Sequence, residues 1–176
     1  LAGTLSERKY EKEGGPGLGT CAELIRRYST QPAVDLRHFI GWIFFNLYAG
    51  NNDSHAKNLS IYNLPGKGVT LTPFYDLMCT RLYPGLSQDF AFEIGGEYKP
   101  AAMTSSNLVP LARQLGMRPQ FLAQQAADLA RRVPDAFERA VKDVKPALPH
   151  SARILAERLQ QFVLSTTKKV AEHLAA

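Results

Sequence analysis

Apolar side chains recur every three or four positions through residues 33–48, and this spacing predicts a helix. The apolar face comprises Leu36, Phe39, Ile40, Ile43, Phe44 and Leu47. Trp42, Phe45 and Tyr48 carry apolar character round to the opposite side, so we expect this helix to be buried at the centre of the fold. Gly50 can take the left-handed conformation and is expected to end the helix.

Two short segments that alternate apolar and polar residues follow this helix and indicate β-strands. Residues 59–62 form the first segment and residues 69–72 form the second. The stretch between them is dense in turn-forming residues, including Pro65 and Gly66. We therefore predict that the two segments pair as a β-hairpin.

The rest of the chain is predicted to be helical, apart from residues 73–100, which prolines and glycines interrupt. Before the central helix, Thr20 and Glu23 have the spacing of a capping box, which predicts that a short helix begins there. After the irregular stretch we expect a helix that ends at Gly116, another that starts after Pro119, and a third towards the carboxyl end. The predicted fold class is therefore mainly α with a small β-hairpin.

The composition agrees with one globular domain and favours one cellular compartment. The chain has 176 residues, of which 45% are hydrophobic and 21% are charged, as in ordinary soluble domains. Its apolar runs are too short to span a bilayer, so no membrane partner is expected. The two cysteines, Cys21 and Cys79, do not make a disulfide framework, which favours the cytoplasm. The net charge of +5 permits contact with nucleotides, nucleic acids or acidic proteins without selecting among them.

Three polar residues around the hairpin are the candidates for chemistry. Asp53 and Asn58 bracket a polar loop between the buried helix and the hairpin, and Asp76 follows the second strand. Because the hairpin folds the chain back on itself, Asn58 at its entrance should lie near its exit, which brings the three residues towards one point. Two carboxylates and an amide oxygen form a ligand set suited to magnesium.

The spacing D-x-x-x-x-N between Asp53 and Asn58 is that of a kinase catalytic loop. This spacing is weak by itself, but the order of loop, hairpin and Asp76 also follows that of kinases. The structural alternative is that Asp and Asn are turn formers, and we prefer that interpretation for Asn51 and Asn52. The Asp53, Asn58 and Asp76 set is instead interpreted as a phosphoryl-transfer site.

Four segments together resemble the carboxyl-terminal domain of the HipA family of toxin kinases. Residues 50–58 resemble the catalytic loop of that family, and residues 73–77 resemble its metal-binding segment. Residues 9–17 and 94–98 resemble the start of the domain and the segment beyond the metal site. The resemblance covers roughly residues 9–116 and implies the helical C-lobe of a protein-kinase-like fold.

The resemblance also implies a domain arrangement. Residues 1–176 would be a HipA-like C-terminal kinase domain. Kinase folds also need an N-terminal lobe with a lysine and a loop over the nucleotide, and no segment before the central helix has strands enough to supply it. The chain starts at Leu1 rather than Met, so we expect a fragment that lacks this lobe and is inactive by itself.

Carried over to this chain, the resemblance assigns a role to each candidate residue. Asp53 would be the catalytic base for a serine or threonine hydroxyl. Asn58 and Asp76 would hold Mg²⁺ on the phosphates of ATP, and Asn58 would also contact the nucleotide. His55 and Lys57 would bind phosphate, although His55 could instead hold the loop and Lys57 could be an ordinary surface lysine.

The function that the resemblance implies is that of a serine/threonine protein kinase in a toxin–antitoxin system, which transfers the γ-phosphate of ATP to a protein hydroxyl. The expected partners are a protein substrate and a DNA-binding antitoxin, with any DNA contact at most indirect. Two alternatives stay open. The first is a small-molecule phosphotransferase of the aminoglycoside type, and the second is a non-catalytic module that binds an antitoxin.

Overall fold

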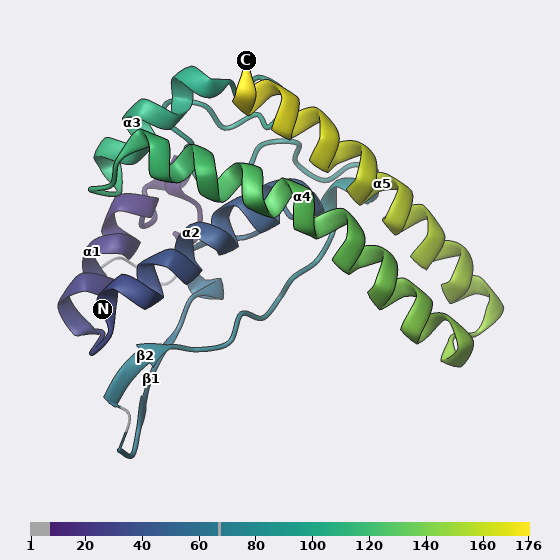
Figure 1. The fold of residues 1–176 in the computed structure, drawn as a ribbon, viewed down its shortest axis with the longest axis horizontal. Coiled ribbons are helices and arrows are strands. Elements are labelled where there is room, and N and C mark those ends of the chain that lie inside the picture. Colours follow the sequence, from purple (N-terminus) through teal and green to yellow (C-terminus); the bar gives the residue numbers. More distant parts are fainter. Residues whose placement is uncertain (1–7, 67) are drawn as a thin grey trace.

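A computed structural model describes residues 8–66 and 68–176 of the chain. The fold is mainly helical and carries one two-stranded antiparallel sheet (Figure 1). The helices and strands, in chain order, are α1 (Leu18–Tyr28), α2 (Pro32–Ala49), β1 (Ile61–Leu64), β2 (Gly68–Leu71), α3 (Leu108–Gln114), α4 (Pro119–Val144) and α5 (His150–Ala175). The mainly α fold class with a small hairpin is therefore confirmed.

Helix α2 is the buried centre of the fold, as its apolar pattern predicts. It packs against α1, α4 and α5, and in Figure 1 it passes beneath α4. Phe39, Phe44 and Tyr48 have no exposed surface, and the Tyr48 hydroxyl donates a hydrogen bond of 2.9 Å to the Ala126 carbonyl of α4. Burial of these large side chains is what holds α2 in place, because apolar surface removed from water stabilises the fold in proportion to its area.

Helix α1 begins earlier than predicted. Gly17 is its N-cap residue, and the Cys21 N–H already donates to the Gly17 carbonyl at 3.1 Å. Thr20 therefore lies inside the first turn, and the predicted capping box with Glu23 is wrong. The physical reason is packing, because Leu18, the first helical residue, is fully buried in the core.

The predicted hairpin is confirmed, with Ile61 paired to Leu71 and Leu64 paired to Gly68. A further backbone bond from Thr72 to Ser60 continues the ladder by one step towards the loop that precedes β1. This pairing brings the chain entering the hairpin next to the chain leaving it.

Asp35, in the first turn of α2, anchors the hairpin to the helical core. It is 1% exposed and accepts hydrogen bonds from Ser29 Oγ at 2.6 Å, Thr70 Oγ1 at 2.9 Å and the Leu71 N–H at 3.0 Å. Hydrogen-bond donors of the protein thus take the place of water around the carboxylate, which is the condition for burying such a group. The contact fixes where the loop before the hairpin sits relative to α2.

Helices α4 and α5 run side by side over much of their length (Figure 1). Pro146 and Pro149 lie in their connection, as predicted. No helix within residues 8–66 and 68–176 combines the length and the apolar character that crossing a bilayer requires.

Residues 73–100 are irregular, as predicted, and the irregular stretch continues to residue 104, with a single short 3-10 turn at Thr80–Leu82. It is nevertheless well packed, since Phe90, Phe92 and Ile94 are almost fully buried. This segment covers the end of α2 from which the polar loop emerges.

Candidate functional site

The polar loop of residues 50–58 leaves the carboxyl end of α2 and leads into the hairpin. Gly50 has a φ of 71° and ends α2, as predicted. Asn51 and Asn52 are buried, and their roles go beyond turn formation. The Asn51 side-chain amide donates to the backbone carbonyl of Asp76 at 3.0 Å, which ties the loop to the segment after β2.

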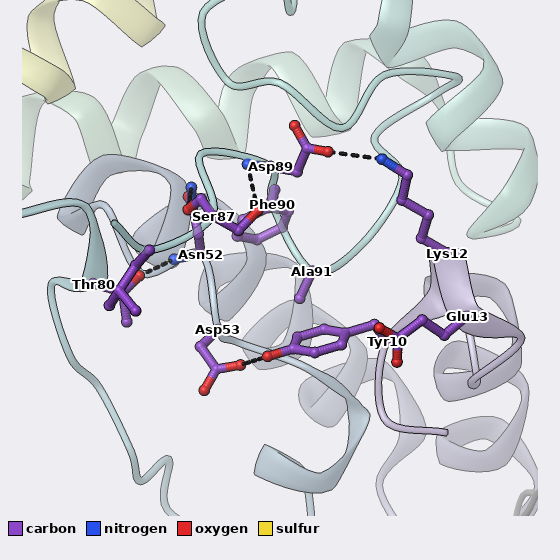
Figure 2. Close-up of a pocket in the computed structure, with 11 residues that line it drawn as sticks. Tyr10, Lys12, Glu13, Asn52, Asp53, Thr80, Ser87, Asp89, Phe90 and Ala91 are labelled. Carbon is purple, nitrogen blue, oxygen red and sulfur yellow. Dashed lines mark hydrogen bonds and ion pairs between the residues drawn. The ribbon is translucent and has the colours of Figure 1, made fainter. Parts of the chain in front are cut away.

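Asn52 ties the same loop to the irregular segment on its other side. Its backbone N–H donates to Thr80 Oγ1 at 2.8 Å, and its side-chain amide donates to the Ser87 carbonyl at 3.2 Å (Figure 2). Buried side chains at both asparagines thus tie the loop that carries Asp53 to the segments on either side of it.

Asp53 projects from this loop with 42% of its side chain exposed. Its Oδ1 oxygen accepts a hydrogen bond from the Tyr10 hydroxyl (Figure 2) and another from Lys9 Nζ at 3.2 Å. Burial raises the pKa of Tyr10 above its ordinary value, and the hydrogen bond with Tyr10 raises the pKa of Lys9. Both groups are therefore protonated donors at neutral pH.

Asn58 and Asp76 are in direct contact, as the hairpin geometry predicts. The Asn58 amide donates to the Asp76 carboxylate, while its oxygen accepts from the His55 backbone N–H at 3.2 Å. Asn58 is 3% exposed and Asp76 is exposed. Among the described non-glycine residues Asp76 alone has a positive φ, 55°, a conformation that Asp tolerates better than most side chains.

His55 connects Asp53 with the Asn58–Asp76 pair. Its Nε2 lies 3.9 Å from Asp53 Oδ1, and its ring meets the Tyr10 ring edge-on at 5.6 Å. Burial lowers the pKa of His55 below its ordinary value, although the Asp53 and Asp76 carboxylates both act to raise it. The imidazole is therefore neutral at physiological pH.

Lys57 is exposed on the same loop. Its backbone carbonyl accepts a hydrogen bond from the Tyr75 hydroxyl at 2.8 Å.

The structure brings Asn58 and Asp76 into contact and places His55 beside Asp53 and Asn58. The carboxylate of Asp53 is bonded to Lys9 and Tyr10 rather than to either of the other two predicted site residues.

A pocket of about 330 Å³ opens beside Asp53 (Figure 2). Of the three residues predicted to carry chemistry, only Asp53 lines it. The other lining residues come from the amino-terminal turn, the polar loop and the irregular segment, and they are Tyr10, Lys12, Glu13, Asn52, Thr80, Leu86, Ser87, Asp89, Phe90 and Ala91. An ion pair of 2.8 Å between Lys12 and Asp89 closes one side of it.

The sequence interpretation missed the direct contacts of Lys9 and Tyr10 with Asp53. Both residues belong to a segment that resembles the start of the HipA domain, but that resemblance carried no role for them. The separation of 43 residues between Tyr10 and Asp53 leaves no periodic or spacing signal from which the contact could be predicted.

The donor set has consequences for metal binding. Within the described residues, no group of three or more His, Cys, Asp or Glu side chains is arranged to hold a metal ion. Asp76 supplies carboxylate oxygens, and Asn58 supplies an amide oxygen that also accepts from the His55 N–H, whereas it is the Asn58 N–H that faces Asp76. Oxygens of these two kinds are ones that Mg²⁺ accepts as a partial shell, completed by water and phosphate oxygens. The residues present therefore fit a magnesium–nucleotide site rather than an all-protein metal cage.

The chain is similar to several curated kinases, of which it spans about a third. It is 35% identical over 152 residues to "Putative kinase Y4mE" of Sinorhizobium fredii, covering 86% of this chain and 36% of that protein. It is 29% identical over 132 residues to "Serine/threonine-protein kinase toxin HipA" of Shewanella oneidensis, covering 75% of this chain and 30% of that protein.

A solved structure shares the fold of the whole chain. It is that of the toxin–antitoxin system of HipA, HipB and its operator DNA from Shewanella oneidensis, with a TM-score of 0.84 and 24% sequence identity. The match covers 100% of this chain and 44% of the chain in that structure. A family profile described as the HipA-like C-terminal domain also matches residues 1–141. The chain therefore belongs to the family of HipA-like C-terminal domains, which includes kinases.

Proposed function

We propose that this chain is the catalytic-loop domain of a serine/threonine protein kinase that transfers the γ-phosphate of ATP to a protein hydroxyl. One observation carries the proposal. The loop that presents Asp53 also contains Asn58, whose amide is bonded to the Asp76 carboxylate across the base of the hairpin. Kinase chemistry needs one carboxylate for the acceptor and a carboxylate–amide pair for the metal.

Asp53 is the proposed base. In the reaction, Asp53 accepts the proton of the acceptor hydroxyl as the hydroxyl oxygen forms its bond to the γ-phosphorus. The bond between that phosphorus and the bridging oxygen breaks, and its electron pair leaves on ADP. A partly exposed carboxylate can be reached by a protein side chain, and Asp53 is 42% exposed.

Asn58 and Asp76 are the residues that would hold Mg²⁺ on the ATP phosphates. When bound, magnesium would neutralise charge on the transferred phosphoryl group. The contact of Asn58 with Asp76 orients both side chains before any nucleotide arrives. The Asn51 bond to the Asp76 backbone holds the second of these residues in place.

His55 and Lys57 have different proposed roles. His55 is buried and neutral, its ring meets the Tyr10 ring edge-on, and its backbone N–H donates to Asn58 Oδ1, so we assign it to holding the loop. Lys57 is exposed on the loop, and its charge suits contact with a nucleotide phosphate.

The proposed partners rest on analogy with the relatives. The matched curated kinases are about three times as long as the aligned part, so we propose that a nucleotide-covering lobe lies outside this chain. The matched structure holds HipA with HipB and operator DNA. By analogy, the complete protein is a cytoplasmic toxin whose partner is a DNA-binding antitoxin, and its own contact with DNA is at most indirect.

The test is phosphotransfer by the complete gene product with γ-labelled ATP and magnesium. Wild type and Asp53→Asn are compared on protein acceptors and on aminoglycosides. Label transferred to serine or threonine by wild type, and lost in Asp53→Asn, is the expected result. Asp143→Asn, a change at an exposed position of α4, is the matched control. Transfer to aminoglycosides alone, or no transfer to any acceptor, would contradict the proposal.

A further inference from the structure

Two donors from one short turn converge on a single oxygen of Asp53. Tyr10 donates through its hydroxyl and Lys9 through Nζ at 3.2 Å, both to Oδ1. Among the described residues, the hydrogen bonds and ion pairs of the Asp53 side chain all fall on this oxygen, and Oδ2 takes part in none. The carboxylate thus has one restrained oxygen and one that is available to a ligand.

The turn that carries these donors is itself held firmly. The Tyr10 carbonyl accepts from the Gly15 N–H at 2.8 Å, and the Glu11 carboxylate accepts from the Glu93 N–H at 2.8 Å. A Cβ on Gly15 would come within 2.7 Å of the Tyr10 carbonyl oxygen, so this tight turn requires glycine. The glycine-rich segment therefore shapes the turn that delivers Tyr10 to Asp53.

The Tyr10 ring is restrained from two further sides. It meets the buried His55 ring edge-on, with ring centroids 5.6 Å apart. Lys9 Nζ lies 4.6 Å from the centroid of the Tyr10 ring. Packing of the ring therefore contributes to aiming the hydroxyl at Asp53, in addition to the hydrogen bond itself. A packed ring of this kind is suited to orienting the carboxylate beside it.

We propose that Tyr10 and Lys9 are positioning residues for Asp53, which hold Oδ1 so that Oδ2 receives the proton of the acceptor hydroxyl. The inference rests on the proposed kinase function. A base must lie within hydrogen-bond reach of the proton that it removes, and small misplacements of reacting groups lower rates strongly. An aspartate with 42% of its side chain exposed needs such restraint, because solvent alone would leave its torsions free.

Tyr10 also lines the pocket beside Asp53 (Figure 2). An acceptor segment in this pocket would approach the carboxylate past the tyrosine ring. Tyr10→Phe removes the hydroxyl and leaves that ring, so it changes the hold on Asp53 without changing the wall of the pocket. Substrate binding and base positioning are therefore separable by this substitution.

The experiment uses the complete gene product and single-turnover phosphotransfer at high enzyme concentration, where small residual rates are measurable. The variants are Tyr10→Phe, Lys9→Met and Lys9→Arg, with Tyr98→Phe as the matched control. Lys12 Nζ lies 5.6 Å from the centroid of the Tyr98 ring, and none of the Asp53 side-chain bonds among the described residues involves Tyr98. We expect Tyr10→Phe and Lys9→Met each to lower the rate of transfer about tenfold, a modest part of the contribution of a general base. Lys9→Arg should restore most of the rate, and ATP affinity and melting temperature should stay at wild-type values.

The double variant Tyr10→Phe with Asp53→Asn separates positioning from other roles. If Tyr10 acts through Asp53, the double variant has the same residual rate as Asp53→Asn alone. A wild-type rate in Tyr10→Phe, or the same tenfold loss in the Asp53→Asn background, would overturn the inference. So would a loss that only follows a lowered melting temperature. A wild-type rate in Asp53→Asn itself would instead overturn the proposed kinase function.

Discussion

The side-chain amide of Asn58 donates a hydrogen bond to the carboxylate of Asp76, although the two residues are 18 positions apart and the entire hairpin lies between them. The hairpin register produces this contact, because the backbone bond between Ser60 and Thr72 brings the two flanking segments together. The contact joins a residue of the polar loop to a residue of the irregular segment. Changes at either end of it should therefore affect nucleotide binding, whereas a change at Asp53 should affect transfer alone.

Asp76→Ala should abolish phosphotransfer and also weaken magnesium-dependent nucleotide binding, whereas Asp53→Ala should abolish transfer and leave nucleotide binding intact. The difference is expected because Asp76 is proposed to act on the metal and Asp53 on the acceptor hydroxyl. Calorimetric titration of ATP with and without magnesium, beside a phosphotransfer assay on the complete protein, measures both. Equal nucleotide affinity in the two variants would contradict the assignment.

Stability is the control for this pair. Asp53 and Asp76 are partly or largely exposed, so each alanine should change the free energy of unfolding by less than about 1 kcal/mol. Phe44→Ala in α2 removes a fully buried ring and should cost roughly 3 kcal/mol or more through the cavity that it leaves. Similar losses of melting temperature in all three would mean that the aspartates are structural.

Asp35→Ala should lower the free energy of unfolding by about 2–4 kcal/mol, since it leaves the Thr70 hydroxyl and the Leu71 N–H without their buried acceptor. Urea denaturation measures the change. Asp143→Ala, at an exposed position of α4, is the control and should stay within about 0.5 kcal/mol of wild type. A similarly small effect of Asp35→Ala would show that the anchor between hairpin and core contributes little.

The fold should lose stability below pH 6.5 partly because of His55. Burial lowers the pKa of His55 in the folded protein, so the unfolded chain binds a proton at this residue more readily than the folded chain does. Stability therefore rises with pH between the folded-state pKa and the ordinary value near 6.5, and falls as the pH is lowered through that window. His55→Gln should show a smaller loss between about pH 7 and pH 5.5 than wild type in urea denaturation.

The difference between the two curves isolates His55, because both proteins share every other titrating group. Parallel curves for wild type and His55→Gln would contradict the prediction. A larger acid loss in the variant would mean that the charged imidazole stabilises the fold.

The 176-residue chain by itself should bind ATP and magnesium weakly and transfer phosphate poorly. Positioning and charge stabilisation are the main terms in phosphoryl transfer, and we propose that much of both comes from a lobe outside this chain. Calorimetry on the isolated chain is the measurement. A submicromolar dissociation constant would contradict the prediction and would mean that residues 1–176 bind the nucleotide without further help.

Local patterns along the chain determined much of the fold. The apolar period of residues 33–48 predicted α2 almost to its ends, and alternation around Pro65 and Gly66 predicted the hairpin. Each of these features depends on neighbours a few residues apart, which is the range over which periodicity and turn chemistry act. The position of Asn58 and Asp76 on either side of the hairpin likewise predicted that these two residues lie near each other, and they are in contact.

Tertiary structure alone decided the remaining features. The start of α1 at Leu18 depended on burial of that residue against the core and not on the capping spacing two residues later. The bonds of Lys9 and Tyr10 to Asp53 join residues more than 40 positions apart. Such contacts have no period and no spacing, because they arise only when packing of α1, α2 and the irregular segment brings distant parts of the chain to one point.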